Sequence, residues 1–257
     1  MLPSYTALQR AIERRRKKND LPYANITSLK DISIPESHQK STKDTNFLLW
    51  DSGVDDNACI LMFGTTENLT LLQENDHWFI DGTFKVAPTL FTQLFTVHAL
   101  INNSAYPLVY VLLPEKTEHG YERVMQKILE LHPGLNPASI MADFEKASLN
   151  ACATIFPGAR LAGCFFHLGQ CLWRKVQECH LAEAYRDDEN VRMYVKMLLA
   201  LSFVPVEDVP DVSWWKAALR NLHQSMITGK TTTWEDEEET VEEIRDFLLI
   251  CGTCATV

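Results

Sequence analysis

Apolar and polar positions separate into clear strand and helix patterns between residues 77 and 180. Short runs rich in β-branched and aromatic residues predict strands, and apolar residues three or four positions apart predict helices. The predicted strands are 77–84, 91–100, 106–113, 139–143 and 159–164, and the predicted helices are 117–131, 144–155 and 165–179. Three antiparallel strands followed by alternating helices and strands predict an α/β fold with a mixed sheet flanked by helices, continuing into a helical C-terminal part.

The order of these elements also predicts where the fourth strand lies. The right-handed crossover rule places strand 139–143 parallel to strand 77–84 and beside it. Strand 106–113 is almost wholly apolar, which predicts burial on both of its faces. Thr117 is placed to cap the helix that follows that strand.

Two segments precede this region. Residues 1–45 are polar and carry a basic run at 14–18, which indicates an N-terminal arm. Residues 46–76 contain two short apolar runs, 47–50 and 59–63, separated by an acidic stretch rich in turn residues. This pattern predicts a hairpin-like leader segment.

Two aspartates end predicted strands that should lie side by side. Asp81 follows the apolar run 78–80, and Asp143 follows the apolar run 140–142. A carboxylate in such a place costs free energy unless it is paired or binds a cation. Two oxygen donors on neighbouring parallel strands suit Mg²⁺ or Mn²⁺, ions that support phosphodiester chemistry. The alternative is structural: Asp81 opens an Asp-Gly turn, and Asp143 caps the next helix.

Other polar residues nearby have both a functional and a structural interpretation. Cys164 and His167 form a Cys-x-x-His pair, which either binds Zn²⁺ with two further ligands or is simply a buried thiol and a polar histidine. Glu145 either favours the dipole of the following helix or assists the metal site. The candidates for contact with nucleic-acid phosphates, each equally explained as part of a solvated surface, are Lys85, Lys146, Arg174 and Lys175.

Composition narrows the class of protein and raises one objection. The chain has 257 residues, 46% hydrophobic and 23% charged, which excludes a mostly disordered chain and a small disulfide scaffold. Seven scattered cysteines indicate a reducing compartment, and no apolar run reaches the roughly 18 residues of a membrane span. The net charge of −10 is unfavourable for binding nucleic acid.

Four motifs, in this order, resemble the Mutator-like element (MULE) transposase domain. They are Trp78-Phe-Ile-Asp-Gly-Thr-Phe-Lys85, Pro107-Leu-Val-Tyr-Val-Leu-Leu-Pro114, Ala142-Asp-Phe-Glu-Lys-Ala147 and Gly163-Cys-Phe-Phe-His-Leu168. The resemblance covers residues 77–210 and implies an RNase H-like core with an Asp-Asp-Glu triad. Asp81 and Asp143 match the first two acids, and Cys164 and His167 match the family's Cys-x-x-His signature. The implied activity is metal-dependent DNA cleavage and strand transfer, with DNA as the partner and a nuclear or other intracellular location.

The chain departs from the family pattern after residue 210. The family's third acid lies on a downstream helix, and residues 211–257 show no matching context. We therefore expect a truncated or rearranged transposase with an incomplete triad and impaired catalysis. Two alternatives stay open: a non-catalytic DNA-binding or regulatory fragment, and an interaction module whose acidic tail contacts a basic protein partner. Each of these is compatible with a homo-oligomer.

Most of the acidity lies outside the region of resemblance. Residues 235–246 hold eight acidic residues and one basic residue, a net of −7, which leaves −3 for the rest of the chain. Residues 77–180 hold eight acidic and eight basic residues and are neutral. Most of the net charge of −10 thus lies in residues 235–246, within the acidic tail at 211–257, and does not argue against a DNA-processing core.

Overall fold

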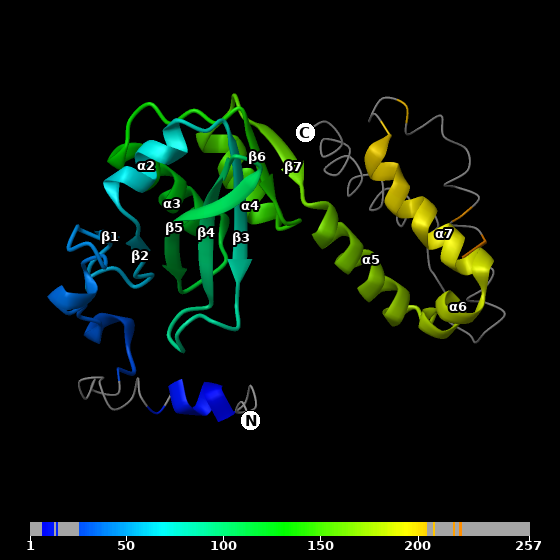
Figure 1. Ribbon diagram of the computed structural model, residues 1–257, viewed down its shortest axis with the longest axis horizontal. Coiled ribbons are helices and arrows are strands. Elements are labelled where there is room, and N and C mark those ends of the chain that lie inside the picture. Colours follow the sequence, from blue (N-terminus) through cyan, green and yellow to red (C-terminus); the bar gives the residue numbers. More distant parts are fainter. Residues whose placement is uncertain are drawn as a thin grey trace.

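The computed structural model describes residues 26–204, together with residues 7–12 and positions 14, 208, 218, 221 and 222. Seven strands form one sheet in the order β1-β2-β5-β4-β3-β6-β7, and helices pack on it (Figure 1). The α/β class predicted from the sequence is confirmed. The predictions about the acidic tail fall outside the described residues, as do those about most of the basic run.

Three strands that follow one another in sequence form the centre of the sheet. β3 (His77–Thr83) pairs antiparallel with β4 (Gln93–Ile101), and β4 pairs antiparallel with β5 (Ser104–Leu113). Asn102 and Asn103 join β4 to β5 with φ values of 50° and 62°, the backbone of a two-residue hairpin turn. The hairpin extends β5 two residues before the start that its apolar run predicts.

Two parallel strands continue the sheet from β3. β6 (Ser139–Ala142) pairs parallel with β3, and β7 (Arg160–Gly163) pairs parallel with β6. The connecting helices are α3 (Glu118–Leu131) and α4 (Lys146–Ile155). The Thr117 side chain caps α3 by accepting the N–H of Gly120. The prediction that the fourth of these strands lies beside the first is confirmed.

One face of the sheet carries the main hydrophobic core. Alternate residues of the central strands pack there against α3, α4 and α2 (Thr66–Gln73). The buried residues include Trp78, Ile80, Phe95, Val97, Val109, Val111, Tyr121, Val124, Met125 and Ile128. The burial of Tyr121, Val124, Met125 and Ile128 matches the helical face expected from their spacing.

The opposite face of the sheet is more open. Phe79, His98 and Tyr110 lie on it and are half-buried. The prediction that strand 106–113 is buried on both faces is therefore wrong. It fails because residues 104–107 at the start of β5 are exposed, and Tyr110 and Leu112, on the face away from the main core, are only partly buried.

The leader segment extends the same sheet. β1 (Leu48–Asp51) and β2 (Leu61–Phe63) form the predicted hairpin, and β2 pairs antiparallel with β5. The guanidinium of Arg123 on α3 forms an ion pair with Asp56 and lies over the ring of Trp50. These contacts anchor the leader to the core. Two short 3₁₀ helices, Leu29–Asp31 and Glu36–His38, precede it.

Helices that follow β7 form a second, smaller core. α5 (Phe165–Glu178) starts at the end of β7 and leads away from the sheet to α6 (Ala182–Asp187) and α7 (Glu189–Ala200) (Figure 1). A 3₁₀ helix, Leu201–Phe203, follows. Val176, Leu181 and Val195 are buried within this cluster. In the described part of the chain, no helix is long and apolar enough to cross a membrane.

Candidate acidic site at the carboxyl ends of β3 and β6

Asp81 lies near the end of β3, and Asp143 directly follows β6, the parallel strand beside it. Phe79 of β3 pairs with Met141 of β6. Two residues further along each strand place Asp81 and Asp143 opposite one another and on the same face, because side chains alternate with a period of two. Neighbouring strands are about 4.8 Å apart. The two carboxylates therefore converge at one edge of the open face.

The surroundings of Asp143 disfavour its negative charge. Burial raises the pKa of Asp143 above its ordinary value. The N–H of Glu145 opposes this rise, the carboxylates of Glu145 and Asp81 add to it, and His167 opposes it. A bound cation would offset the repulsion between the carboxylate of Asp143 and those of its two neighbours.

His167 joins the two acids from the first turn of α5. Its Nε2 lies 3.8 Å from Oδ1 of Asp81, whose side chain is 43% exposed. The Nδ1 of His167 is buried and has no hydrogen-bond partner among the described residues. Cys164 is the N-cap residue of α5, and its N–H donates to the carbonyl of Ala142, one residue before Asp143. The two residues of the Cys-x-x-His motif therefore place the start of α5 next to the acidic site.

The donor set fits a divalent cation in its chemistry. Asp81 and Asp143 supply hard oxygen atoms, which suit Mg²⁺ or Mn²⁺. Among the residues that the structure describes, no group of three or more His, Cys, Asp or Glu side chains is placed to hold a metal ion. The described site is therefore a pair of oxygen ligands that needs a further donor. Zn²⁺ at Cys164 and His167 stays a prediction.

Glu145 is held away from the role of a free ligand. The sequence predicts Glu145 in the first turn of α4, and the structure places it one position earlier, as the N-cap residue of that helix. One carboxylate oxygen accepts the hydroxyl of Tyr121 at 2.8 Å, and the other lies 3.0 Å from Nζ of Lys116. The N–H of Glu145 donates to Oδ1 of Asp143 at 3.3 Å. Asp143 therefore makes the kind of local hydrogen bond at the start of α4 that its structural interpretation predicts, and it also lies beside Asp81.

Asp143 is also fixed by the packing of its neighbour Phe144. A Cβ atom on Gly163 would lie 2.6 Å from Cζ of the Phe144 ring, closer than such contacts allow. The ring therefore occupies space at the end of β7 that only a glycine leaves open.

Gly163→Ala is expected to destabilise the protein by about 1–3 kcal/mol, because the new methyl group displaces Phe144. Chemical denaturation measures this effect. Gly169→Ala is the matched control, since no atom lies within 4 Å of a Cβ there and alanine favours the helix. Equal stability of the two variants would contradict this packing argument.

The raised pKa of Asp143 also predicts how stability depends on pH. The folded protein holds its proton to a higher pH than the unfolded chain, whose reference pKa is 3.8. Stability should therefore fall as pH rises from that value through the folded-state pKa. Asp143→Asn should remove this part of the dependence, which denaturation midpoints measured between about pH 4 and about pH 7 will show. A pH dependence that is identical in the variant would contradict the assigned cause.

The basic residues considered from the sequence are exposed. Lys85 follows β3, and Lys146 is the first residue of α4, so both lie on the segments that carry the acids. Arg174 contacts Cys171, and Lys175 forms an ion pair with Glu178, so both have local partners on α5. No sequence signal marked Lys116, which comes from the loop before α3 and reaches Glu145 only in the folded chain.

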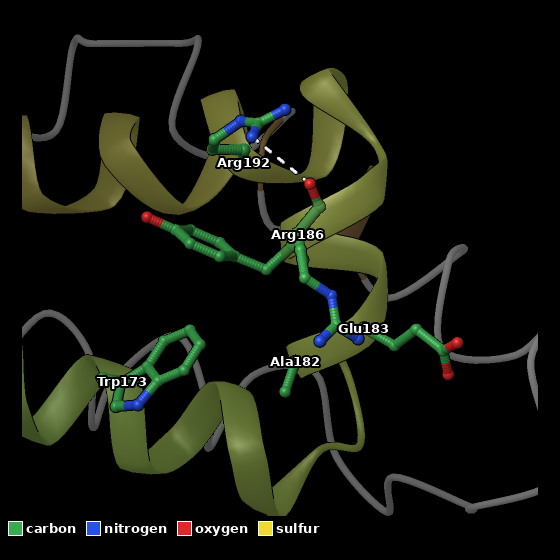
Figure 2. Close-up of a pocket in the computed structure, with 6 residues that line it drawn as sticks. Trp173, Ala182, Glu183, Arg186 and Arg192 are labelled. Carbon is green, nitrogen blue, oxygen red and sulfur yellow. Dashed lines mark hydrogen bonds between the residues drawn. The ribbon is translucent and has the colours of Figure 1, made fainter.

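A cavity in the helical part lies apart from this site. It has a volume of about 610 Å³ and lies among α5, α6 and α7 (Figure 2). Its lining residues are Trp173, Ala182, Glu183, Tyr185, Arg186 and Arg192. The rings of Trp173 and Tyr185 meet edge to face, with centroids 5.2 Å apart. None of the lining residues belongs to the four motifs, and they carry charges of both signs, so we assign the cavity no part in the site.

The fold and the site define a mixed α/β domain with paired aspartates at the carboxyl ends of adjacent parallel strands. Residues 77–170 match the family model of the MULE transposase domain. This segment contains all four motifs, so the resemblance inferred from them is confirmed over these residues. No curated protein matches the chain. The match points to a transposase-related role in DNA processing.

Proposed function

We propose that the chain contains a transposase-derived DNA-processing domain in which Asp81 and Asp143 bind Mg²⁺ or Mn²⁺ and direct hydrolysis of a DNA phosphodiester bond. One observation carries the proposal: the two aspartates converge on adjacent strands within a segment that matches a transposase domain. A divalent cation between them would supply the Lewis acidity that phosphodiester hydrolysis requires.

The residues around the two acids have separate tasks in this proposal. Asp81 is the more open of the two and faces the DNA, while Asp143 is more buried and is held by the N–H of Glu145. His167 lies beside Asp81 and can donate a hydrogen bond to it or to a phosphate oxygen. Lys85 and Lys146 are exposed on the same segments and can neutralise backbone phosphates.

The proposal includes impaired catalysis. The described residues supply two acids of the triad that the resemblance implies, and among them no third acid completes a second metal-binding position. We therefore expect slow hydrolysis and no strand transfer, which needs two well-held cations to align attacking and leaving oxygens. A nuclear location and self-association complete the proposal.

Incubation of the purified chain with supercoiled plasmid tests the proposal. We expect slow nicking with Mn²⁺ or Mg²⁺, none with EDTA, and no joining of a labelled 3′-hydroxyl end to target DNA. Absence of nicking with either ion, at low salt and high protein concentration, would contradict the proposed cleavage.

A second candidate function is DNA binding without cleavage. It is favoured by the lack of a complete three-ligand group among the described residues. It predicts DNA retention that falls steeply with salt, because phosphate contacts release counterions, and no nicking. A third candidate, in which the acidic tail binds a basic protein, concerns residues outside the described part. It predicts that deletion of 235–257 abolishes capture of such a partner.

A further inference from the structure

A chain of buried polar groups lies behind the two aspartates, on the core side of the sheet. Gln93 of β4 is fully buried, and its Nε2 donates to the hydroxyl of Tyr121. Tyr121 is 1% exposed and donates to Glu145, whose other oxygen is paired with Lys116. Burial raises the pKa of Tyr121 well above its ordinary range, so the hydroxyl stays protonated as a donor.

These polar groups lie at core positions where apolar side chains would cost less free energy on folding. The residues around it, such as Phe95 and Val111, belong to the main core. Polar groups buried among them cost free energy unless each is satisfied, and replacing such a pair with apolar residues of similar volume is often neutral or stabilising. The placement of Gln93 and Tyr121 is therefore better explained by what they position than by stability.

One end of the chain of groups reaches Asp143. Both oxygens of the Glu145 carboxylate are held, one by Tyr121 and one by Lys116. This fixes the backbone of Glu145, whose N–H donates to Oδ1 of Asp143. The orientation of the Asp143 carboxylate thus depends on the Tyr121 hydroxyl through one intervening residue.

The other end reaches the segment that carries Asp81. Gly82 points to the core side of β3, where a Cβ atom would lie 2.6 Å from Oε1 of Gln93. Oε1 itself has no hydrogen-bond partner among the described residues. The amide of Gln93 therefore fits directly against the backbone that follows Asp81, and its position is set by its bond to Tyr121.

We infer that Gln93 and Tyr121 are positioning residues that hold Asp81 and Asp143 in the relative geometry required to share a divalent cation. This inference rests on the proposed function, because it assigns the two side chains a task at the same metal site. Groups that orient metal ligands from behind commonly change metal affinity about 10- to 100-fold when they are altered.

Tyr121→Phe removes the hydroxyl and keeps the ring, which packs 5.2 Å from Phe95. We expect the half-saturating Mn²⁺ concentration, measured by electron paramagnetic resonance, to rise about 10-fold. Hydrogen exchange at residues 143–147 should accelerate in parallel. Gln93→Met, which conserves volume, should show the same increase. Tyr110→Phe is the control, because the hydroxyl of Tyr110 only reaches the carbonyl of Pro107 at 3.5 Å.

The outcomes separate this inference from the proposed function. Unchanged Mn²⁺ affinity in both Tyr121→Phe and Gln93→Met, with binding intact in the unaltered chain, would overturn the inference alone. No Mn²⁺ binding by the unaltered chain would overturn the proposed function and the inference together. A lowered melting temperature without a change in Mn²⁺ affinity would show that the two residues act only on stability, which also overturns the inference.

Discussion

Asp81→Asn and Asp143→Asn are each expected to reduce metal-dependent nicking of plasmid DNA by about 10²-fold or more. Each change keeps the shape of the side chain and removes the charge that binds the cation. The effect should exceed that of altering a supporting residue, because the removed oxygen belongs to a proposed ligand. Initial rates of nicking over a range of Mn²⁺ concentrations measure it.

A matched control lies on the same strand segment. Asp76 directly precedes β3, at the end opposite to Asp81, and is exposed. Asp76→Asn should nick DNA at the rate of the unaltered chain. Asp143→Asn should fold at least as stably as the unaltered chain, since burial and neighbouring carboxylates already disfavour the charge there. Nicking that survives both changes would remove the catalytic assignment.

Trp78→Ala is expected to have the largest effect on stability, a loss of about 3–5 kcal/mol. Trp78 is 1% exposed, and its Nε1 donates to the carbonyls of Leu72 and Asn75. Its ring meets Phe156 edge to face, with centroids 5.4 Å apart. The side chain therefore ties β3, the strand that ends in the acidic site, to α2 and to the end of α4.

Urea denaturation followed by circular dichroism measures this loss. Trp173→Ala is the control, because Trp173 is 40% exposed on α5 and lies in the second cluster of helices. Because β3 carries both Trp78 and Asp81, unfolding of the main core should also abolish the acidic site. Mn²⁺ binding should therefore disappear at a lower urea concentration in Trp78→Ala than in the unaltered chain. Similar denaturation midpoints for the two variants would contradict the central place of Trp78 in the core.

The placement of the two acids could be predicted because it depends on local pattern and chirality. Apolar runs mark strands β3 and β6, and the crossover rule then sets them side by side and parallel. A carboxylate after each run must lie at the same edge of the sheet. The apolar run before each aspartate marked its position without knowledge of long-range contacts, and the role of the two aspartates as metal ligands stays a prediction.

The groups that support the acids could not be predicted in the same way. Lys116, Tyr121 and Glu145 come together from the loop before α3, from α3 and from the start of α4. Spacing predicts that Tyr121 is buried, and does not show which polar group its hydroxyl meets. One feature of the sequence does point to these groups. Gln93 is a polar residue at the start of an apolar strand, and its side chain is fully buried. A buried amide requires a partner, so such a position indicates a polar network.

The leader segment illustrates a second limit of sequence patterns. Its two runs predicted a hairpin, which the structure contains. The pairing of β2 with β5 depends on residues that are about fifty positions apart, and α2 has only two buried apolar residues, Leu69 and Leu72. Neither feature has a periodic signal of its own, because tertiary contacts stabilise both.

Binding of Mn²⁺ to the purified chain tests the central claim most directly. Electron paramagnetic resonance counts free Mn²⁺, so a titration gives the number of bound ions and their affinity without any requirement for catalysis. We expect saturable binding of one ion in the unaltered chain and in Asp76→Asn, and no saturable binding in Asp81→Asn or Asp143→Asn. Binding that is equal in all four proteins would contradict the assignment of Asp81 and Asp143 as a shared metal site.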